Sequence, residues 1–472
     1  MTPFNKKIVF WGCGQIGNDF FEFCNPYFSI PDYFCDSNPL LWGEKYKGIT
    51  VISPYDLKND EIKYVFITVN AYEGVLYRLQ EMGIEKNKIL LTTDIFRTDV
   101  IKDLAYCMRA TKASNILYEQ KKIFVDLSCG MVLGGVERWS YYTAENVKNI
   151  GLDGEYLIPF SRSITIEDNS LPRYIVGESD NSLEIISSSI TRIKEYRLPI
   201  VICNFPFEIL QAACVTKKFI NKRTKVIAVI HNDESIYYEG YGIWKKYIDI
   251  FFAISKKIYQ NLVELGFPQE KIRLLSWNMT FPENNRIIPK NRRLIKIGYA
   301  GRLSYEQKRV DLLVQVALGL KKAGVDFVMQ IAGVGDYMGE LQKRAMASEL
   351  GGLFQVMGYI SHDQIYEFWN DQDIYISCSE YEGHSISQTE AMAMGVVPIV
   401  TRTSGTEDDI KDGYNGYIVE IGDTKGIIQR IISLCDNPKM MQQMSKNASE
   451  TIRRKNNPQG EIDFWKDIFG NV

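Results

Sequence analysis

The feature of this sequence that most constrains its fold is an alternation of short apolar segments with longer amphipathic ones. The alternation starts three times, at residues 7–11, 121–127 and 295–300. Strands that alternate with helices predict parallel sheets covered by helices. A chain of 472 residues also exceeds the size of about 250–300 residues at which a single core stops growing. We therefore predict an α/β fold with three units in series, whose strands include Lys225–Ile230 and Ile374–Ser377.

Two stretches without this alternation separate the units. Residues 97–120 carry no strand pattern, so a connecting helix is expected there, and Pro282–Arg293 is rich in Pro, Asn and Arg, as is typical of a linker. The expected domains are 1–95, 121–290 and 291–455, with a connecting helix over 96–120 and a C-terminal helix over 456–472 that crosses back to the second domain.

Composition excludes several classes of protein. The nine cysteines are scattered and no two are separated by two residues, which disfavours a disulfide framework or a zinc site. A net charge of −3 gives no electrostatic footprint for nucleic acid. The stretch Pro199–Val215 is interrupted by polar residues and falls short of the roughly 18–20 apolar residues that span a bilayer. Lys6 and Lys7 lead directly into a strand, which is unlike a signal peptide. A cytoplasmic protein is expected.

The third unit begins with a strand, a glycine and two cations. The strand over 295–300 ends at Gly301, and Arg302 and Lys308 follow before the next helix. Open α/β sheets bind ligands at the carboxyl ends of their strands. Two cations beside a helix N-terminus suit a diphosphate. The alternative is a pair of solvated surface charges.

Two glutamates eight residues apart mark a second element of this unit. Glu382 is expected in a loop and Glu390 on the following helix. The backbone N–H groups of His384, Ser385 and Ile386 would then point at an anion. Carboxylates accept hydrogen bonds from the paired hydroxyls of a sugar. The alternative is an exposed capping box with a surface glutamate.

The strand–glycine–cation segment and the pair of glutamates follow one another along the chain together with two further segments, Ile331–Asp336 and Thr403–Glu407. Together they resemble the C-terminal domain of retaining GT-B glycosyltransferases, glycosyltransferase family 4 (group 1). The resemblance covers about residues 121–470 and is specific over 294–420. It implies two facing Rossmann-like domains, a nucleotide-sugar donor such as a UDP- or GDP-sugar, and no required cofactor. No Asp-x-Asp element stands at a strand end, and Asp371–Asp373 is interpreted as a turn, so a metal is not required.

The resemblance also implies roles for individual residues. In the donor site, Arg302 and Lys308 would hold the diphosphate, Glu382 would lie by the sugar, Glu390 would bind the ribose, His384, Ser385 and Ile386 would supply backbone contacts, and Gly333 and Gly335 would pack near the base. The family often has an aromatic residue or proline where this chain has His384 and Ser385, which leaves the donor sugar open.

The second unit is expected to be the acceptor-side domain. The resemblance places Gly134 and Gly135 near the donor phosphates and His231 near the donor sugar, whereas a plain strand–helix turn and a structural histidine are the alternatives. His231 and Glu382 are the candidate catalytic residues, without His231 being assigned as a base. Retention of configuration follows from the resemblance, with the leaving phosphate helping to deprotonate the acceptor.

The first unit carries a glycine-rich turn between a strand and a helix. Gly12, Gly14 and Gly17 form it, and Asp36 ends the next strand, as in a dinucleotide-binding fingerprint. The unit also resembles the small Rossmann-like domain at the front of some sugar acyltransferases, which binds a nucleotide sugar. NAD(P), a nucleotide sugar and a scaffold without a ligand are the three alternatives.

A basic segment precedes the strand that leads to His231. Lys217, Lys218, Lys222 and Arg223 are either a solvated helix end or a contact with an anionic membrane surface. Similar enzymes often act on lipid-linked acceptors at the cytoplasmic membrane, so the inner face of that membrane is one expected location.

The sequence therefore predicts a retaining glycosyltransferase of surface polysaccharide biosynthesis. Its partners would be a nucleotide sugar and a glycan or polyprenyl-diphosphate-linked acceptor, with no nucleic acid. The alternatives are an NAD(P)-dependent enzyme that modifies sugar nucleotides through the first domain, and a GT-B scaffold without catalytic activity.

Overall fold

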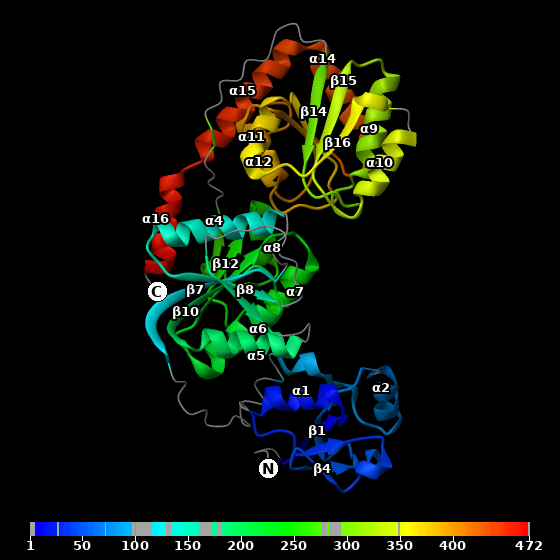
Figure 1. Cartoon of the computed structure of the whole chain (residues 1–472), viewed down its shortest axis with the longest axis vertical. Coiled ribbons are helices and arrows are strands. Elements are labelled where there is room, and N and C mark those ends of the chain that lie inside the picture. The colour runs from blue at the N-terminus through cyan, green and yellow to red at the C-terminus, as the bar shows by residue number, and fades with distance from the viewer. Residues whose placement is uncertain are drawn as a thin grey trace.

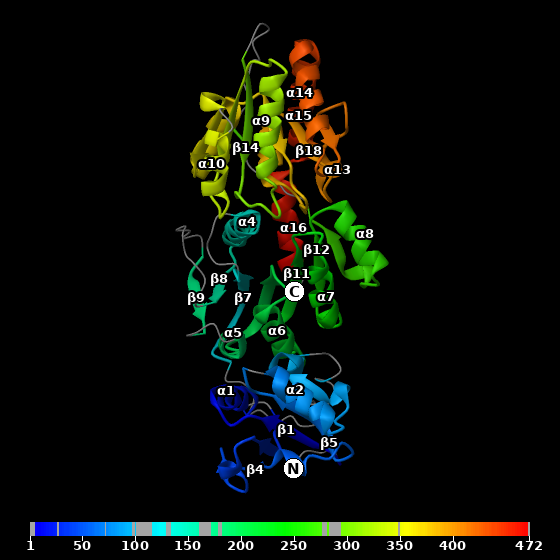
Figure 2. The same cartoon turned by 90° about the vertical axis from the view of Figure 1, so that its right-hand side faces the viewer.

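Three sheets follow one another along the longest axis of the molecule, in chain order from the N-terminal end (Figures 1 and 2). The structure is a computed structural model. It describes residues 5–25, 28–70, 72–96, 100, 116–128, 134–159, 171–177, 182–275, 281–282, 294–347 and 350–470. Most of the predicted linker over 282–293 lies outside these ranges.

The first sheet has six strands in the order β3-β4-β2-β1-β5-β6. Among the strand pairs that the structure describes in this sheet, β3–β4 alone is antiparallel. The helix α1 covers one face, where Phe20 packs against Phe10 and Phe66, and α2 covers the other. The bounds are β1 (Lys7–Trp11), α1 (Gln15–Cys24), β2 (Tyr33–Cys35), β3 (Lys45–Tyr46), β4 (Ile49–Ile52), β5 (Ile62–Ile67), α2 (Tyr72–Glu81) and β6 (Ile89–Leu91).

The second sheet has seven parallel strands in the order β13-β12-β11-β10-β7-β8-β9. The helices between its strands bury apolar side chains in one core cluster with the sheet. The bounds are β7 (Tyr118–Asp126), α4 (Gly135–Asn149), β8 (Gly154–Pro159), β9 (Arg173–Val176), α5 (Ser182–Ile193), β10 (Tyr196–Cys203), α6 (Glu208–Val215), β11 (Lys225–Ile230), α7 (Ser235–Trp244), β12 (Ile250–Ala253), α8 (Lys256–Glu264) and β13 (Ile272–Leu274).

The start of this sheet corrects the predicted connecting helix over 96–120. The strand β7 already begins at Tyr118, and its exposed polar first residues gave no apolar pattern. They become a strand because they pair with β10, where the Tyr118 ring stacks on Tyr196 with centroids 4.7 Å apart. Most of the remaining stretch lies outside the described residues.

The third sheet has six parallel strands in the order β16-β15-β14-β17-β18-β19. The long helix α15 was not predicted, because polar and basic residues dominate its sequence. The bounds are β14 (Ile295–Ala300), α9 (Asp311–Lys322), β15 (Phe327–Ala332), α10 (Met338–Ala347), β16 (Phe354–Gly358), α11 (His362–Asn370), β17 (Ile374–Ser377), α12 (Ile386–Ala393), β18 (Val397–Thr401), α13 (Thr406–Asp409), β19 (Tyr417–Val419), α14 (Thr424–Asp436), α15 (Pro438–Lys455) and α16 (Pro458–Gly470).

The last helix, α16, returns to the second domain (Figure 1). Its Trp465 ring lies 6.3 Å from the Trp139 ring of α4 and 5.7 Å from Phe252 of β12. Lys121 Nζ donates to the Phe469 carbonyl oxygen at 2.5 Å. The chain end therefore ties the third domain back onto the second.

The buried residues show which domains share a core. One continuous apolar cluster runs through the first and second sheets, and the Phe28 and Phe219 rings meet across it at 6.2 Å. The third sheet has clusters of its own. Within the described ranges, no helix is both long and apolar enough to cross a membrane.

Strand order predicts where each sheet can bind a ligand. In the third sheet the chain runs outward from β14 to β16 and resumes on the other side at β17, so β14 and β17 flank the point where the order reverses. In the second sheet, β7 and β10 flank the corresponding point. Ligands of open α/β sheets bind in the crevice at such points, outside the carboxyl ends of the strands.

Candidate active site

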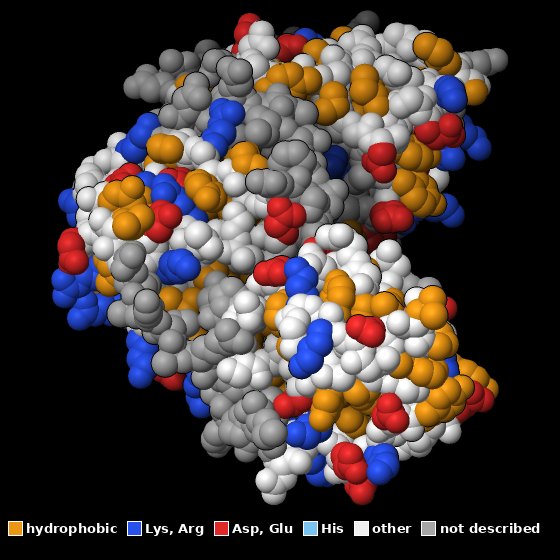
Figure 3. Space-filling model, turned by 60° about the horizontal axis from the view of Figure 1, so that its bottom comes forward, with side chains coloured by type: hydrophobic (Ala, Val, Ile, Leu, Met, Phe, Trp, Pro, Cys, Tyr) orange, Lys and Arg blue, Asp and Glu red, His pale blue; other side chains and the backbone are white. Residues whose placement is uncertain are grey.

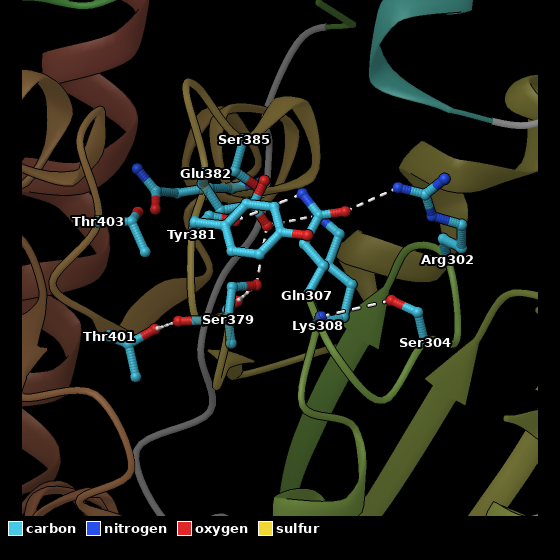
Figure 4. Close-up of polar contacts among 12 residues, drawn as sticks. Arg302, Ser304, Gln307, Lys308, Ser379, Tyr381, Glu382, Ser385, Thr401 and Thr403 are labelled. Atoms are coloured by element: carbon cyan, nitrogen blue, oxygen red, sulfur yellow. Dashed lines mark hydrogen bonds and ion pairs between the residues drawn. The ribbon is translucent and has the colours of Figure 1, made fainter. Parts of the chain in front are cut away.

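The loops that follow β14 and β17 meet at the point where the strand order of the third sheet reverses (Figure 4). Gln307 joins them, because its carbonyl oxygen accepts from Glu380 N at 2.8 Å and its side-chain oxygen accepts from Arg302 Nη2 at 2.7 Å. Arg302 is exposed, and no carboxylate among the described residues pairs with it. Its guanidinium therefore keeps donors for an anion.

Lys308 lies in the same loop but contacts a carboxylate. Its Nζ forms a close ion pair with Glu382 Oε1, which also accepts from Ser379 Oγ at 2.8 Å (Figure 4). Both side chains are mostly buried, at 18% and 11% exposure. The two predicted donor-site residues are thus brought together and neutralise each other.

Hydroxyl groups line a small pocket at the N-terminus of α12. Ser385 is the N-cap residue of that helix, and its Oγ accepts from Gln388 N at 3.3 Å. The pocket is lined by Ser377, Ser379, Glu382, Ser385, Gln388, Val400, Thr401, Thr403, Gly405 and Thr406. Hydroxyl and amide donors at a helix N-terminus favour an anion such as phosphate. Sequence reasoning did not single out Ser379 or Thr401, although Ser379 lies two residues after β17 and Thr401 is the last residue of β18.

Glu390 lies on α12 and is 5% exposed. Burial raises the pKa of this carboxyl to about 7, while the positive charge of Arg138 acts in the opposite direction. Arg138 belongs to α4 of the second domain. The electrostatic environment of Glu390 is therefore set by both domains.

His384 and Ile386 stand at the start of the same helix. The His384 Nε2 atom lies 3.0 Å from Thr389 Oγ1, so this ring turns back onto its own helix. The Ile386 side chain faces Gly135, where an added Cβ would be 3.9 Å from its Cδ1. Gly134 is the residue before α4 and adopts an extended conformation. The predicted glycine pair thus lies across the domain interface from α12.

His231 comes directly after β11 and is 4% exposed. Its Nε2 lies 2.9 Å from Asn204 Oδ1, and burial lowers its pKa to about 3, so the ring is neutral. Its backbone packs against the loop that carries Glu382, since a Cβ on Gly383 would overlap the His231 carbonyl oxygen.

Two polar contacts hold the same interface. Ser404 Oγ donates to Asp233 Oδ2 at 2.5 Å, and Lys256 N donates to Asp408 Oδ2 at 2.9 Å. The carboxyl ends of the second and third sheets therefore face each other (Figure 2). The arrangement brings His231, Gly134 and Gly135 beside the Glu382–Glu390 segment.

Gly333 and Gly335 allow the loop after β15 to pack closely on the loop after β14. A Cβ on Gly333 would overlap the Gly301 carbonyl oxygen, and one on Gly335 would overlap the backbone of Leu303. Only residues without a side chain permit this approach. Their expected place beside a nucleotide base stays a prediction.

The glycine turn of the first domain has the predicted local form. Gly12 has a φ of +125°, and a Cβ on Gly17 would overlap the Gly12 carbonyl oxygen. The Asp36 carboxylate forms hydrogen bonds within the domain. Its Oδ2 accepts from Cys13 N at 2.9 Å and its Oδ1 accepts from Asn38 N at 2.9 Å. The Asp36 carboxylate thus accepts from a backbone N–H group within this turn.

The surface of this domain offers a different feature. Hydrophobic side chains gather on the end of the molecule that comes forward in Figure 3, and Leu40, Tyr55 and Tyr77 are 85%, 74% and 64% exposed.

In the glycine turn of the same domain, Gly14 has open space around it. The ligand alternatives for Gly12, Gly14, Gly17 and Asp36 stay predictions.

The basic segment lies between the first and second domains. Lys217 pairs with Asp249 at 2.5 Å, and the Lys218 ammonium lies 5.4 Å from the centre of the Tyr247 ring. Phe219 faces the first domain rather than solvent. Lys222 and Arg223 are exposed. Membrane contact by these cations stays a prediction.

The described part of the chain holds no group of three or more His, Cys, Asp or Glu side chains that could bind a metal. Asp371 instead pairs with Lys296 at 2.5 Å, and Asp373 Oδ2 accepts from Lys296 N at 2.9 Å, so both carboxylates fix a turn. Metal independence stays a prediction.

Comparison with known families gives two matches. Residues 280–451 match the family described as glycosyl transferases group 1, and residues 4–90 match the family described as C2185-like, N-terminal. The first match contains Arg302, Lys308, Glu382 and Glu390. The second contains the glycine turn and Asp36, and it does not bear on the predicted likeness to sugar acyltransferases.

Several curated proteins are similar over part of the chain. An uncharacterised glycosyltransferase of Methanocaldococcus jannaschii is 25% identical over 52% of this chain. The poly(ribitol-phosphate) alpha-N-acetylglucosaminyltransferase of Staphylococcus aureus is 27% identical over 37%, and the capsular polysaccharide biosynthesis glycosyltransferase CapM of Staphylococcus aureus is 26% identical over 46%. The chain covers 64%, 35% and 59% of the lengths of these relatives.

Solved structures show the fold. S. aureus TarM, solved as a mutant with fondaparinux, alpha-GlcNAc-glycerol and UDP, aligns with a TM-score of 0.61 at 14% identity, over 74% of this chain and all of that one. Anabaena HepE with UDP and glucose aligns with a TM-score of 0.62 at 14% identity, over 75% of this chain and all of that one. The chain thus has the GT-B fold behind an additional N-terminal α/β domain, and its residues 280–451 match the family described as glycosyl transferases group 1.

Proposed function

We propose that the protein is a retaining glycosyltransferase that moves a sugar from a nucleotide-diphosphate sugar to a glycan or lipid-linked acceptor. The observation that carries this proposal is the cluster of anion-binding groups where the strand order of the third sheet reverses. Arg302, the hydroxyl pocket and the N-terminus of α12 converge there, opposite the second domain. The relatives include a glycosyltransferase of capsular polysaccharide biosynthesis, which favours a role in surface polysaccharides.

The donor would bind through its charges first. Arg302 and the N–H groups at the start of α12 would hold the diphosphate, whose negative charge also attracts Lys308 away from Glu382. The released Glu382 carboxylate could then accept from hydroxyl groups of the donor sugar. Glu390 in its ionised form would accept from the two ribose hydroxyls.

The UDP in the neighbouring structures supports UDP as the nucleotide of this chain, and the shared fold supports a donor bound between the second and third domains. The Lys308–Glu382 ion pair supports a site that stays neutral until an anion arrives.

Catalysis would then be electrostatic. The bond between the anomeric carbon and the diphosphate oxygen breaks, and both electrons leave with the nucleoside diphosphate. Arg302, Lys308 and the helix N-terminus stabilise the charge that develops on this leaving group, in place of a metal ion. The acceptor hydroxyl attacks from the same face, forms the new glycosidic bond and gives its proton to the departing phosphate oxygen.

The acceptor would lie on the second domain. An acceptor linked to polyprenyl diphosphate would bring the enzyme to the inner face of the cytoplasmic membrane, where the exposed Lys222 and Arg223 could contact anionic lipid. Flotation with vesicles that contain or lack phosphatidylglycerol tests this part. Binding that requires the anionic lipid and weakens with salt supports it, and no binding to either vesicle removes it.

The test of the proposed function is release of nucleoside diphosphate from a panel of UDP-, GDP- and ADP-sugars. At least one donor should be cleaved by the wild type, and Arg302→Ala should lower the rate by a factor of about 100, as expected for the loss of one transition-state charge partner. Gly339→Ala, at a helical site with open space, is the matched control. Once an acceptor is found, the anomeric configuration of the product read by NMR decides between retention and inversion.

A further inference from the structure

A buried polar network joins the carboxyl ends of three neighbouring strands in the second domain. Asp126 ends β7, Asn204 follows β10 and His231 follows β11. Asp126 and Asn204 are fully buried and His231 is 4% exposed. Buried polar groups of this kind are retained only when their hydrogen bonds are made, so the bonds define how each side chain must be oriented.

Asp126 anchors the network. Its Oδ1 accepts from Ser128 N at 2.8 Å and from Ser128 Oγ at 2.5 Å. Its Oδ2 accepts from Asn204 N at 3.1 Å and Phe205 N at 3.2 Å. The carboxylate thus fixes the backbone of the loops after both β7 and β10.

The orientation of the Asn204 amide follows from its partners. The Asn204 Nδ2 atom lies 2.7 Å from the Asp126 carbonyl oxygen, which can only accept, and 2.9 Å from Ser140 Oγ. The nitrogen must therefore be on this side and the oxygen on the other. Asn204 Oδ1 is an acceptor only, and it lies 2.9 Å from His231 Nε2.

Because an amide oxygen cannot donate, the hydrogen of this last bond must come from His231. A neutral imidazole carries one proton, so a proton on Nε2 leaves Nδ1 as a lone-pair acceptor. No group of the described residues hydrogen-bonds Nδ1. The Trp139 ring, edge-on at 5.2 Å between centroids, restricts the imidazole further.

We propose that Asn204 is a positioning residue that holds neutral His231 with its proton on Nε2, so that Nδ1 accepts a hydrogen bond from a hydroxyl group of the bound sugar. As an acceptor, Nδ1 pairs with a hydrogen-bond donor and not with an ionised phosphate or carboxylate oxygen. The hydroxyl groups of a nucleotide sugar are such donors, and its ionised diphosphate is not. The identity of the partner rests on the proposed function, whereas the proton position does not.

The small number of histidines makes the proton position measurable. The chain has three, so protein labelled with ¹⁵N-histidine gives three sets of ring signals, and His231→Gln identifies the set that belongs to His231. In the wild type, long-range ¹H–¹⁵N correlation should show a protonated Nε2 and an unprotonated Nδ1 for His231. A protonated Nδ1 in the wild type overturns the proposal, whatever the activity.

A variant then tests the role of Asn204. Asn204→Leu keeps a similar volume but removes the acceptor, so His231 should show a mixture of proton positions. The rate of donor cleavage at saturation should fall by about tenfold, the equivalent of one hydrogen bond. Asn447→Leu, which removes another buried asparagine that donates to the Tyr414 carbonyl oxygen, is the control and should leave the His231 signals unchanged.

The outcomes separate the two proposals. Unchanged proton positions in Asn204→Leu, with an unchanged cleavage rate, contradict the positioning role. If no nucleotide sugar is cleaved by the wild type but Nε2 carries the proton, the proposed function fails and the proton assignment stands. If Asn204→Leu does not fold, the wild-type spectrum alone still decides the proton position.

Discussion

Replacing Glu390 by glutamine should change how the stability of the protein depends on pH. Glu390 is 5% exposed, and burial raises the pKa of its carboxyl from 4.5 to about 7, with Arg138 acting against the rise. The pKa is raised by about 2.5 units. At about 1.36 kcal/mol per unit, ionisation of Glu390 lowers the free energy of unfolding by about 3 kcal/mol.

The direction of this pH dependence follows from the protonation state of Glu390 that the folded protein prefers. A raised carboxyl pKa means that the folded protein favours the protonated form, so ionisation of Glu390 destabilises the fold. This cost is absent below about pH 4.5, where the carboxyl is protonated in both states, and complete above about pH 7, where it is ionised in both. Glu390→Gln is neutral at every pH and escapes the cost.

Urea denaturation of both proteins between pH 4.5 and 8 measures this difference. The free energy of unfolding of Glu390→Gln, minus that of the wild type, should rise by about 3 kcal/mol across the range. Glu450→Gln, at an exposed position of α15, should show no such rise. A difference that stays constant with pH, or falls, would refute the account of Glu390 as a carboxylate whose ionised form is disfavoured by burial.

Three further predictions concern the contacts between domains and the donor site. Gly383→Ala should separate the second and third domains, because its Cβ would overlap a backbone oxygen of the second domain; small-angle scattering should show a larger radius of gyration, and Gly339→Ala should not. Trp465→Ala should cost about 3–5 kcal/mol of stability and release α16, seen as faster hydrogen exchange over 458–470, since this side chain is 1% exposed. Lys308→Ala should lower the free energy of unfolding by about 2 kcal/mol, because it leaves the Glu382 carboxylate without its ion-pair partner. Adding Glu382→Gln should recover most of this loss in urea denaturation. Full additivity of the two changes would argue against the ion pair.

The strands with continuous apolar sequences could be predicted from the sequence almost to the residue. Lys225–Ile230 and Ile374–Ser377 have the predicted bounds, because strands buried on both faces of a parallel sheet must be apolar throughout. The polar start of β7 and the whole of α15 could not be predicted. Their stability comes from partners distant in the sequence, such as Tyr196 for Tyr118.

In the candidate site too, some features could be predicted from the sequence and others could not. Loop positions at the ends of strands were predictable, since strand ends and glycines mark them. Pairwise contacts were not: the ion pair of Lys308 with Glu382 and the hydrogen bond of Asn204 with His231 join segments 74 and 27 residues apart. Asn204 has no motif of its own, and only the proximity of three strand ends gives it a role.

The central claim is that the carboxyl end of the third sheet binds a nucleoside diphosphate. Calorimetric titration of UDP and GDP into the wild type, Arg302→Ala and Gly339→Ala tests it most directly. The account predicts that one of the two nucleotides binds the wild type and Gly339→Ala equally, and that Arg302→Ala weakens binding by at least tenfold. Equal binding to all three proteins, or binding to none, would contradict it.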